Sequence, residues 1–270
     1  MHLKRWITAL IALPLLIIVI IKGGSTLFTL CVAVVCVLTL WEYFRIVYHN
    51  HSPSVPSVFP ILAFLISVAM ITMVQNHGFK AVTALITINI IGVAFLSILR
   101  FKLSQDAPVV AAKQVFGVVY IGLFLTFAVL LHAADDGIHW VLLILLVIAA
   151  GDTGAYYAGS YLGRHKLCPS VSPKKTIEGA IGGLLANLII GIAYKMFFLP
   201  SLTLWGCALL VLVVGGVGQA GDLFESEFKR AADIKDSGTL LPGHGGFFDR
   251  IDALLFALPT AYLLKEYILL

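Results

Sequence analysis

Long apolar runs follow one another along almost the whole chain, separated by short breaks that carry turn residues and charges. An α-helix rises about 1.5 Å per residue, so crossing about 30 Å of hydrocarbon takes roughly 20 apolar residues. Nine runs approach that length: 6–21, 26–44, 58–74, 79–99, 108–131, 138–161, 177–198, 201–219 and 251–269. The pattern predicts an all-α, polytopic integral membrane protein with about nine transmembrane helices.

The composition agrees with a membrane protein. The chain is 60% hydrophobic and 12% charged, whereas soluble proteins have about 45–50% apolar and about 25% charged residues. The net charge of +4 comes from basic residues that flank apolar runs, which membrane topology explains better than nucleic-acid binding. The four cysteines have no metal-type spacing, so neither a zinc site nor a disulfide framework is expected. The basic, apolar N-terminus has no clear signal-peptidase site and is interpreted as a retained first span.

Basic residues tend to lie on the cytoplasmic side of a membrane protein, and this rule orients the nine runs. With the N-terminus in the cytoplasm, 14 basic residues fall inside: Lys4, Arg5, Arg45, Arg100, Lys102, Lys113, Arg164, Lys166, Lys174, Lys175, Lys229, Arg230, Lys235 and Arg250. Four fall outside: Lys22, Lys80, Lys195 and Lys265. The asymmetry predicts a cytoplasmic N-terminus.

Polar and small residues are unevenly distributed among the runs. The first five runs carry few polar residues, so residues 1–135 are interpreted as a scaffold and 136–270 as the catalytic region of a single membrane-embedded unit. Small residues recur at four-residue spacing in the sixth and seventh runs, which favours close packing of these two helices. The residues are Ala150, Gly154 and Ala158 in one run, and Gly179, Gly183 and Gly191, with Asn187 in the gap, in the other.

The stretch from Gly221 to Asp252 differs from the rest because eleven of its 32 residues are charged. If the eighth helix continues past Gly221, then Asp222, Ser226, Lys229 and Arg230 share one face. Asp249 and Asp252 lie three residues apart at the start of the ninth run, on one side of a helical turn. A solvated cytoplasmic loop is the alternative interpretation, but a carboxylate at the end of a membrane span is costly and usually functional.

The glycine-rich loop Pro242-Gly243-His244-Gly245-Gly246 separates these two acidic helix ends. Glycine lets backbone amides approach a phosphate closely, and carboxylates suit Mg²⁺ that is shared with substrate phosphates. His244 could act as a base, contact a phosphate or form a structural hydrogen bond.

A second polar set, Ser172 to Gly179, follows Asp152 in the sixth run. Ser172 or Pro173 could start the seventh helix, with Lys174, Lys175 and Glu178 in its opening turns. A helix cap at Ser172 and a topology signal at the two lysines are the simpler interpretations of these residues.

Together these motifs resemble those of the phosphatidate cytidylyltransferases, or CDP-diacylglycerol synthases. The first motif is Ser226-x-Phe228-Lys229-Arg230, then Lys235-Asp236-x-Gly238, then Leu241-Pro242-x-His244-Gly245-Gly246-Phe247-x-Asp249-Arg250-Ile251-Asp252. The second is Ser172-Pro173-Lys174-Lys175-Thr176-Ile177-Glu178-Gly179, preceded by Asp152-Thr153-x-Ala155-Tyr156. The C-terminal half carries the resemblance, whereas the first 140 residues agree only in hydropathy.

The resemblance implies transfer of cytidylyl from CTP to phosphatidic acid, with Mg²⁺ required and pyrophosphate released. It also implies a homodimer in the cytoplasmic (inner) membrane, with its active site facing the cytoplasm. We assign catalysis to Lys229, Arg230, Asp249 and Asp222, and the metal to Asp222, Asp249, Asp252 and Asp152. Substrate binding is assigned to Ser172, Lys174, Lys175, Ser226, Lys235, His244, Gly245, Gly246 and Arg250.

Three other functions are consistent with parts of the pattern. A CTP-dependent lipid kinase would use similar groups but would release CDP. A transporter would place its charges near the membrane midplane between repeated halves, whereas here they collect at one surface and no repeat is evident. A structural or assembly protein would leave the charges as loops and would not respond to CTP.

Overall fold

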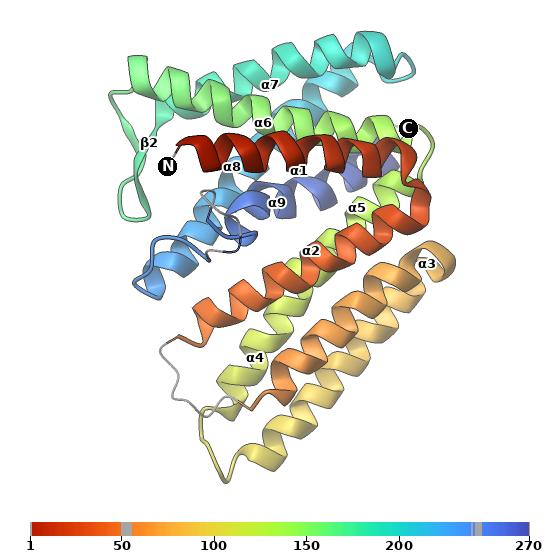
Figure 1. The fold of residues 1–270 in the computed structure, drawn as a ribbon, viewed down its shortest axis with the longest axis vertical. Helices are drawn as coiled ribbons and strands as arrows, with labels where there is room; N and C mark the ends of the chain where they lie inside the picture. Colours follow the sequence, from red (N-terminus) through yellow and green to blue (C-terminus); the bar gives the residue numbers. More distant parts are fainter. Residues whose placement is uncertain (1, 50–55, 239, 241–244, 270) are drawn as a thin grey trace. The chain divides into compact units, whose positions relative to one another are not determined.

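The computed structural model describes residues 2–49, 56–238, 240 and 245–269 (Figure 1). Helices dominate, because hydrocarbon offers the backbone no hydrogen-bond partner and a helix satisfies its own N–H and C=O groups. In chain order the elements are α1 (His2–Lys22), α2 (Gly24–Val47), α3 (Val58–Arg100), α4 (Ala107–Gly117), the π-helical η1 (Val118–Leu123), α5 (Phe124–Ala133), α6 (Gly137–Leu162), β1 (Lys166–Cys168), β2 (Ser172–Thr176), α7 (Ile177–Phe198), α8 (Leu204–Ala231), α9 (Phe248–Leu264) and the π-helical η2 (Lys265–Leu269).

Among the described residues, six helical stretches are long and apolar enough to cross a membrane. They are Gly24–Val47, Val58–Arg100, Ala107–Ala133, Gly137–Leu162, Ile177–Phe198 and Leu204–Ala231. The first predicted run lies in α1, whose described apolar stretch is only Leu13–Lys22, and the last lies in the 17-residue α9 and in η2. An integral membrane protein is therefore confirmed, while the number nine stays a prediction.

Helix α3 contains two of the predicted runs, 58–74 and 79–99. At Gly78 the backbone leaves the helical region (φ 60°, ψ −159°), a conformation with positive φ that glycine adopts without a steric penalty. The two halves fold back on each other in Figure 1, and a Cβ placed on Gly92 would lie 3.9 Å from Cδ2 of Leu62. The two runs are thus the arms of a helical hairpin.

The prediction that every element is helical, with Ser172 or Pro173 at a helix start, is wrong in one place. Ser172–Thr176 forms the strand β2, which pairs antiparallel with β1, so that Lys166 lies opposite Thr176 and Cys168 opposite Ser172. Pro173 has no N–H and fits a two-stranded sheet in which both strands are edges. Helix α7 begins afterwards, at Ile177, where the Thr176 hydroxyl accepts a hydrogen bond from the Gly179 N–H (3.1 Å).

The chain divides into two compact units, residues 1–130 with 231–250, and residues 131–230 with 251–270. The segment 231–250, which carries much of the charged stretch, therefore packs with the N-terminal helices. The division predicted from the sequence, scaffold 1–135 and catalytic region 136–270, concerned function and stays a prediction.

In the first unit, α2 and α4 are joined by polar contacts to the backbone. Hydroxyl Oη of Tyr43 donates to the Lys113 carbonyl (3.0 Å), and the Lys113 ammonium donates to the Val47 carbonyl at the end of α2 (2.7 Å). Asn89 and Gln114 form a buried amide pair between α3 and α4 (2.9 and 3.2 Å). These bonds satisfy polar groups that hydrocarbon would leave unpaired.

In the second unit, α6 and α7 pack through small residues, as the sequence predicts (Figure 1). A Cβ on Gly182 would lie 2.2 Å from Cβ of Ala158, and one on Gly154 would lie 2.6 Å from Cβ of Ala186. No side chain larger than hydrogen fits at these two positions, so the glycines allow the two helices to approach closely.

Candidate functional site

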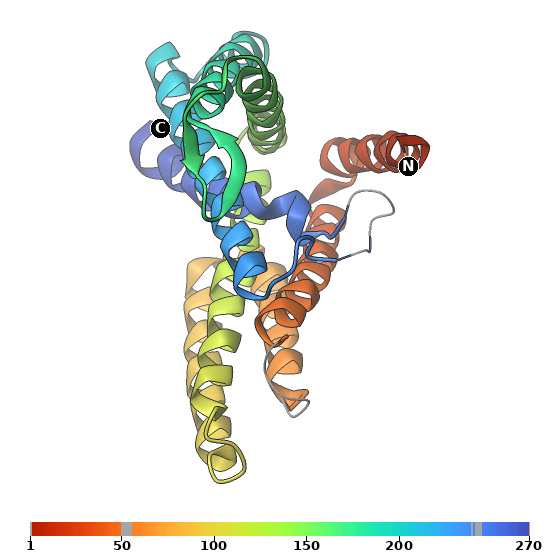
Figure 2. The same ribbon diagram turned by 90° about the vertical axis from the view of Figure 1, so that its left-hand side faces the viewer.

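The C-terminal end of α8 and the β1–β2 hairpin meet within the second unit (Figure 2). The Lys175 ammonium lies 2.7 Å from Oδ2 of Asp222, and both side chains are partly exposed, at 28% and 34%. The Arg230 guanidinium donates through Nε to the Val171 carbonyl in the turn of the hairpin (3.2 Å). The structure thus brings together one acidic and two basic residues that the sequence assigns to the site.

The base of the hairpin is fixed by Glu178, at the start of α7. Its carboxylate accepts hydrogen bonds from the backbone N–H groups of Arg164 (3.1 Å) and His165 (3.2 Å), and it lies 2.6 Å from Nδ1 of His165. A carboxylate is also stabilised at the N-terminus of a helix. Because these bonds fix the base of the hairpin, strand β2 holds Lys175 next to Asp222 of α8.

Sequence reasoning missed the role of Glu225, although it lies within the charged stretch. Its side chain is completely buried, and Oε2 lies 2.5 Å from the Lys229 ammonium, which is 11% exposed. The signal was available as a Glu–Lys pair at i and i+4 on one helix. Ser226, which the sequence places on a face with Asp222 and Lys229, is buried as well, at 8% exposure.

Three predicted metal-binding residues in this unit are close enough to interact. The charges of Asp222, Asp152 and Lys229 act electrostatically on Asp252, which lies beside α8, since a Cβ on Gly221 would lie 2.7 Å from the Asp252 carbonyl oxygen. Among the described residues, no three His, Cys, Asp or Glu side chains form a ready metal cage. Mg²⁺ commonly uses one or two carboxylates together with waters and substrate phosphates, so this donor set fits that kind of site.

The fourth predicted metal-binding residue, Asp249, lies in the first unit at the start of α9. Its Oδ2 accepts hydrogen bonds from the Ser237 N–H (3.0 Å), the Ser237 hydroxyl (2.9 Å) and the Gly246 N–H (3.0 Å). Gly245, with φ +84°, approaches the same oxygen: a Cβ there would lie 2.9 Å from it. Gly245 and Gly246, the described part of the predicted glycine-rich loop, therefore lie against the carboxylate, and a side chain at Gly245 would crowd it.

Glu42, in α2, is a second residue that the sequence did not point to. It is 0% exposed, and its Oε2 accepts hydrogen bonds from the Ser237 hydroxyl (3.0 Å) and the Phe248 N–H (2.8 Å). The sequence shows it only as a single carboxylate within an apolar run of the predicted scaffold. The residues that it contacts lie about 200 positions later in the chain, and sequence spacing does not show such contacts.

The other predicted binding residues are placed as follows. Lys174 is exposed on β2, and Ser172 is partly buried at the start of that strand. Lys235 and Arg250 are exposed in the first unit. His244 lies outside the described residues.

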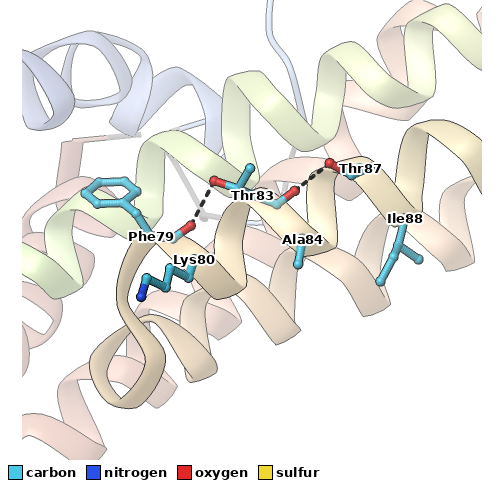
Figure 3. Close-up of a pocket in the computed structure, with 6 residues that line it drawn as sticks. All are labelled: Phe79, Lys80, Thr83, Ala84, Thr87 and Ile88. Atoms are coloured by element: carbon cyan, nitrogen blue, oxygen red, sulfur yellow. Dashed lines mark hydrogen bonds between the residues drawn. The ribbon is translucent and has the colours of Figure 1, made fainter.

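A pocket of about 670 Å³ lies on the second arm of α3 (Figure 3). It is lined by Phe79, Lys80, Thr83, Ala84, Thr87 and Ile88. The hydroxyls of Thr83 and Thr87 donate to backbone carbonyls of their own helix (2.9 Å each). None of the lining residues is acidic or belongs to the predicted site, so the pocket has no carboxylate for a metal.

Comparison with known proteins agrees with these motifs. The model of the cytidylyltransferase family matches residues 3–268. The chain is similar to proteins named phosphatidate cytidylyltransferase from Staphylococcus haemolyticus (37% identity), Staphylococcus saprophyticus (35%) and Staphylococcus aureus (34%), in each case over 96% of this chain and 97% of the relative. The resemblance inferred from the motifs is confirmed, and it extends to the N-terminal half. The chain therefore belongs to the cytidylyltransferase family.

Proposed function

We propose that this protein transfers the cytidylyl group of CTP to phosphatidic acid, forming CDP-diacylglycerol and pyrophosphate. The observation that carries the proposal is the nearly full-length similarity to relatives named phosphatidate cytidylyltransferase. The membrane helices agree with a lipid substrate, because acyl chains can enter between helices directly from the bilayer.

In the reaction, a phosphate oxygen of phosphatidic acid attacks the α-phosphorus of CTP. The new bond joins this oxygen to the α-phosphorus, while the bond from the α-phosphorus to the bridging oxygen of the β-phosphate breaks and pyrophosphate leaves. The attacking phosphate is already ionised near neutral pH, since the second pKa of a phosphate monoester is about 6. The protein's main tasks are therefore positioning and charge neutralisation.

Basic side chains of the second unit supply part of that neutralisation. Lys175, Lys229 and Arg230 each have a described polar partner (Asp222, Glu225 and the Val171 carbonyl), which holds the cations in place before a substrate binds. Guanidinium and ammonium groups bind phosphate through charge-assisted hydrogen bonds. We assign Lys175, Lys229 and Arg230 to the phosphates of CTP or of the lipid.

Asp222 and Asp252, with Asp152, would hold Mg²⁺ in this unit, and the ion would neutralise phosphate charge when bound. We also assign Asp249 to Mg²⁺, because it lies in the family motif. Asp222→Asn and Asp249→Asn test the two assignments separately.

The topology completes the proposal. We place nine helices in the cytoplasmic (inner) membrane, with the N-terminus and the charged residues on the cytoplasmic side, where CTP is available. The 14 basic residues on that side against four on the other support this orientation. The protein functions as a homodimer, as the resemblance implies, and cysteine accessibility to a membrane-impermeant reagent tests the orientation.

The function is tested with purified protein, phosphatidic acid, CTP and Mg²⁺. We expect CDP-diacylglycerol and pyrophosphate in equal amounts. Release of CDP together with a newly phosphorylated lipid would identify a lipid kinase instead, and cargo flux in proteoliposomes without CTP consumption would identify a transporter.

A further inference from the structure

Glu42 is a carboxylate buried inside a membrane-spanning helix. It is 0% exposed, and among the described residues no lysine, arginine or histidine forms an ion pair with it. A carboxylate in such a place is costly unless hydrogen bonds compensate, and it is usually functional when retained. Here the compensation comes from the Ser237 hydroxyl and the Phe248 N–H.

Ser237 connects Glu42 to Asp249. Its Oγ lies 3.0 Å from Oε2 of Glu42 and 2.9 Å from Oδ2 of Asp249. Oγ also accepts a weaker hydrogen bond from the Asp249 N–H (3.4 Å). A serine hydroxyl has a single proton and donates to one of the two carboxylates at a time. Both carboxylates nevertheless lie within hydrogen-bond distance of Oγ, so Glu42 helps to fix the position of Ser237, and Ser237 that of Asp249.

The backbone at Gly238 and Gly246 leaves little space for another arrangement of this cluster. A Cβ on Gly238 would lie 2.3 Å from Oε1 of Glu42, and one on Gly246 would lie 2.1 Å from the Ser237 hydroxyl and 2.3 Å from Oε2 of Glu42. The Phe248 ring is 0% exposed and packs edge to face against Tyr43 and Tyr120, with ring centroids 6.3 and 6.0 Å apart. The start of α9 is therefore fixed by both hydrogen bonds and aromatic packing.

We propose that Glu42 is a positioning residue for cytidylyl transfer, because it fixes the carboxylate of Asp249 through Ser237. The proposal rests on the proposed function, in which Asp249 is assigned to Mg²⁺. Glu42 acts as a hydrogen-bond acceptor and does not itself contact the substrate or the metal. Partners that orient a metal ligand typically change metal affinity or activity by about 10- to 100-fold when they are removed.

Two substitutions of Glu42 separate hydrogen bonding from charge. Glu42→Gln keeps a carbonyl oxygen that can accept from both Ser237 and Phe248, so it should retain most of the activity. Glu42→Leu has similar volume and no acceptor, so the Mg²⁺ concentration for half-maximal activity should rise about tenfold or more and kcat should fall. If Glu42→Gln loses as much as Glu42→Leu, the charge itself is needed and the positioning role is wrong.

Ser237→Ala keeps the test valid if Glu42→Leu does not fold. This variant removes the shared hydroxyl but retains the bond from Phe248 to Glu42, so it should fold and still require more Mg²⁺. The matched control is Ser97→Ala, which removes another buried hydroxyl of the same unit, at 8% exposure, and should behave as wild type. A Ser237→Ala protein with wild-type kcat and Mg²⁺ requirement would overturn the proposal.

A readout without turnover separates this proposal from the proposed function. Thermal unfolding of each purified protein is followed while MgCl₂ alone is titrated. We expect Ser237→Ala to need about tenfold more Mg²⁺ than wild type for the same stabilisation, and Asp249→Asn to lose that response. If wild type makes no CDP-diacylglycerol but these shifts are observed, the proposed function fails, whereas the positioning of Asp249 for Mg²⁺ stands. Identical titrations for Ser237→Ala and wild type would contradict the role.

Discussion

Two polar regions of this protein are constructed in opposite ways. The basic face, formed by Lys175, Asp222, Lys229 and Arg230 in the second unit, consists mainly of side chains that solvent reaches, such as Lys175 and Asp222 at 28% and 34% exposure. The buried bridge, formed by Glu42, Ser237 and Asp249 in the first unit, has Glu42 at 0% and Ser237 at 3% exposure.

The difference indicates different tasks. An exposed ion pair contributes only about 0–1 kcal/mol to stability, so Lys175 can exchange Asp222 for a substrate phosphate at small cost. A buried hydrogen-bonded carboxylate has no such alternative, since leaving it unpaired costs several kcal/mol. The basic face is suited to binding charge, and the buried bridge to holding a backbone and a side chain in one position.

The largest effect on stability is expected at the ion pair of Lys229, the most buried lysine of the basic face, with the buried Glu225. Lys229→Met leaves the Glu225 carboxylate buried without this cation, which should destabilise the protein by about 3–5 kcal/mol. Thermal unfolding measures the loss. The double variant Glu225→Gln/Lys229→Met should recover stability but not activity. Normal turnover in the double variant would show that Lys229 does not contact a substrate phosphate.

The next effect concerns the acidic member of the basic face. Asp222→Asn should lower kcat by about 100- to 1,000-fold, equivalent to about 2.7–4 kcal/mol. The reason is that the variant loses a charged ligand of Mg²⁺, and the ion stabilises phosphate charge. The stability of this variant should change little, because the ion pair of Asp222 with Lys175 is partly exposed. Glu227→Gln, an exposed position on the same helix, is the control and should keep wild-type activity. Near-normal turnover in Asp222→Asn would show that the metal assignment is wrong.

The buried bridge is tested by adding one methyl group. Gly246→Ala should cost about 1–3 kcal/mol, because its Cβ would lie 2.1 Å from the Ser237 hydroxyl. Gly216→Ala is the comparison within a helix: nothing lies within 4 Å of its Cβ, so stability should stay within about 1 kcal/mol or increase. Equal unfolding temperatures for the two variants would mean that Gly246 is not tightly packed against the bridge.

The smallest effect on stability is expected at Lys175. Lys175→Met should change the free energy of unfolding by less than about 1 kcal/mol, while kcat/KM falls roughly tenfold or more through the loss of a charged contact. Lys166→Met, an exposed lysine on the other strand of the hairpin, should leave kcat/KM unchanged. If both variants lose the same activity, general positive charge on the hairpin would explain the effect, and not a contact made by Lys175.

The apolar pattern predicted most of the helices because hydrocarbon leaves the backbone few alternatives. It also predicted the glycine and alanine contacts between α6 and α7. It did not predict β2, since Ser172-Pro173 is equally compatible with a helix start and with an edge strand. The register with Lys166–Cys168 decides between them, and such pairing is not visible in local spacing.

For the site, the sequence identified residues by type and motif but not by partner. The pairing of Lys175 with Asp222 joins two motifs about 50 residues apart, and the charge density of each motif pointed to them. Glu42 had no such signal, because it lies alone in an apolar run and contacts residues about 200 positions away. Its burial and its hydrogen bonds define its role, and both require the tertiary structure.

The most direct test of the function is to follow each phosphate of CTP separately with purified protein, phosphatidic acid and Mg²⁺. With CTP labelled at the α-phosphate, the label should enter the lipid. With CTP labelled at the γ-phosphate, it should be released as pyrophosphate and the lipid should stay unlabelled. A lipid labelled from the γ-phosphate, or one unlabelled from either, would contradict cytidylyl transfer.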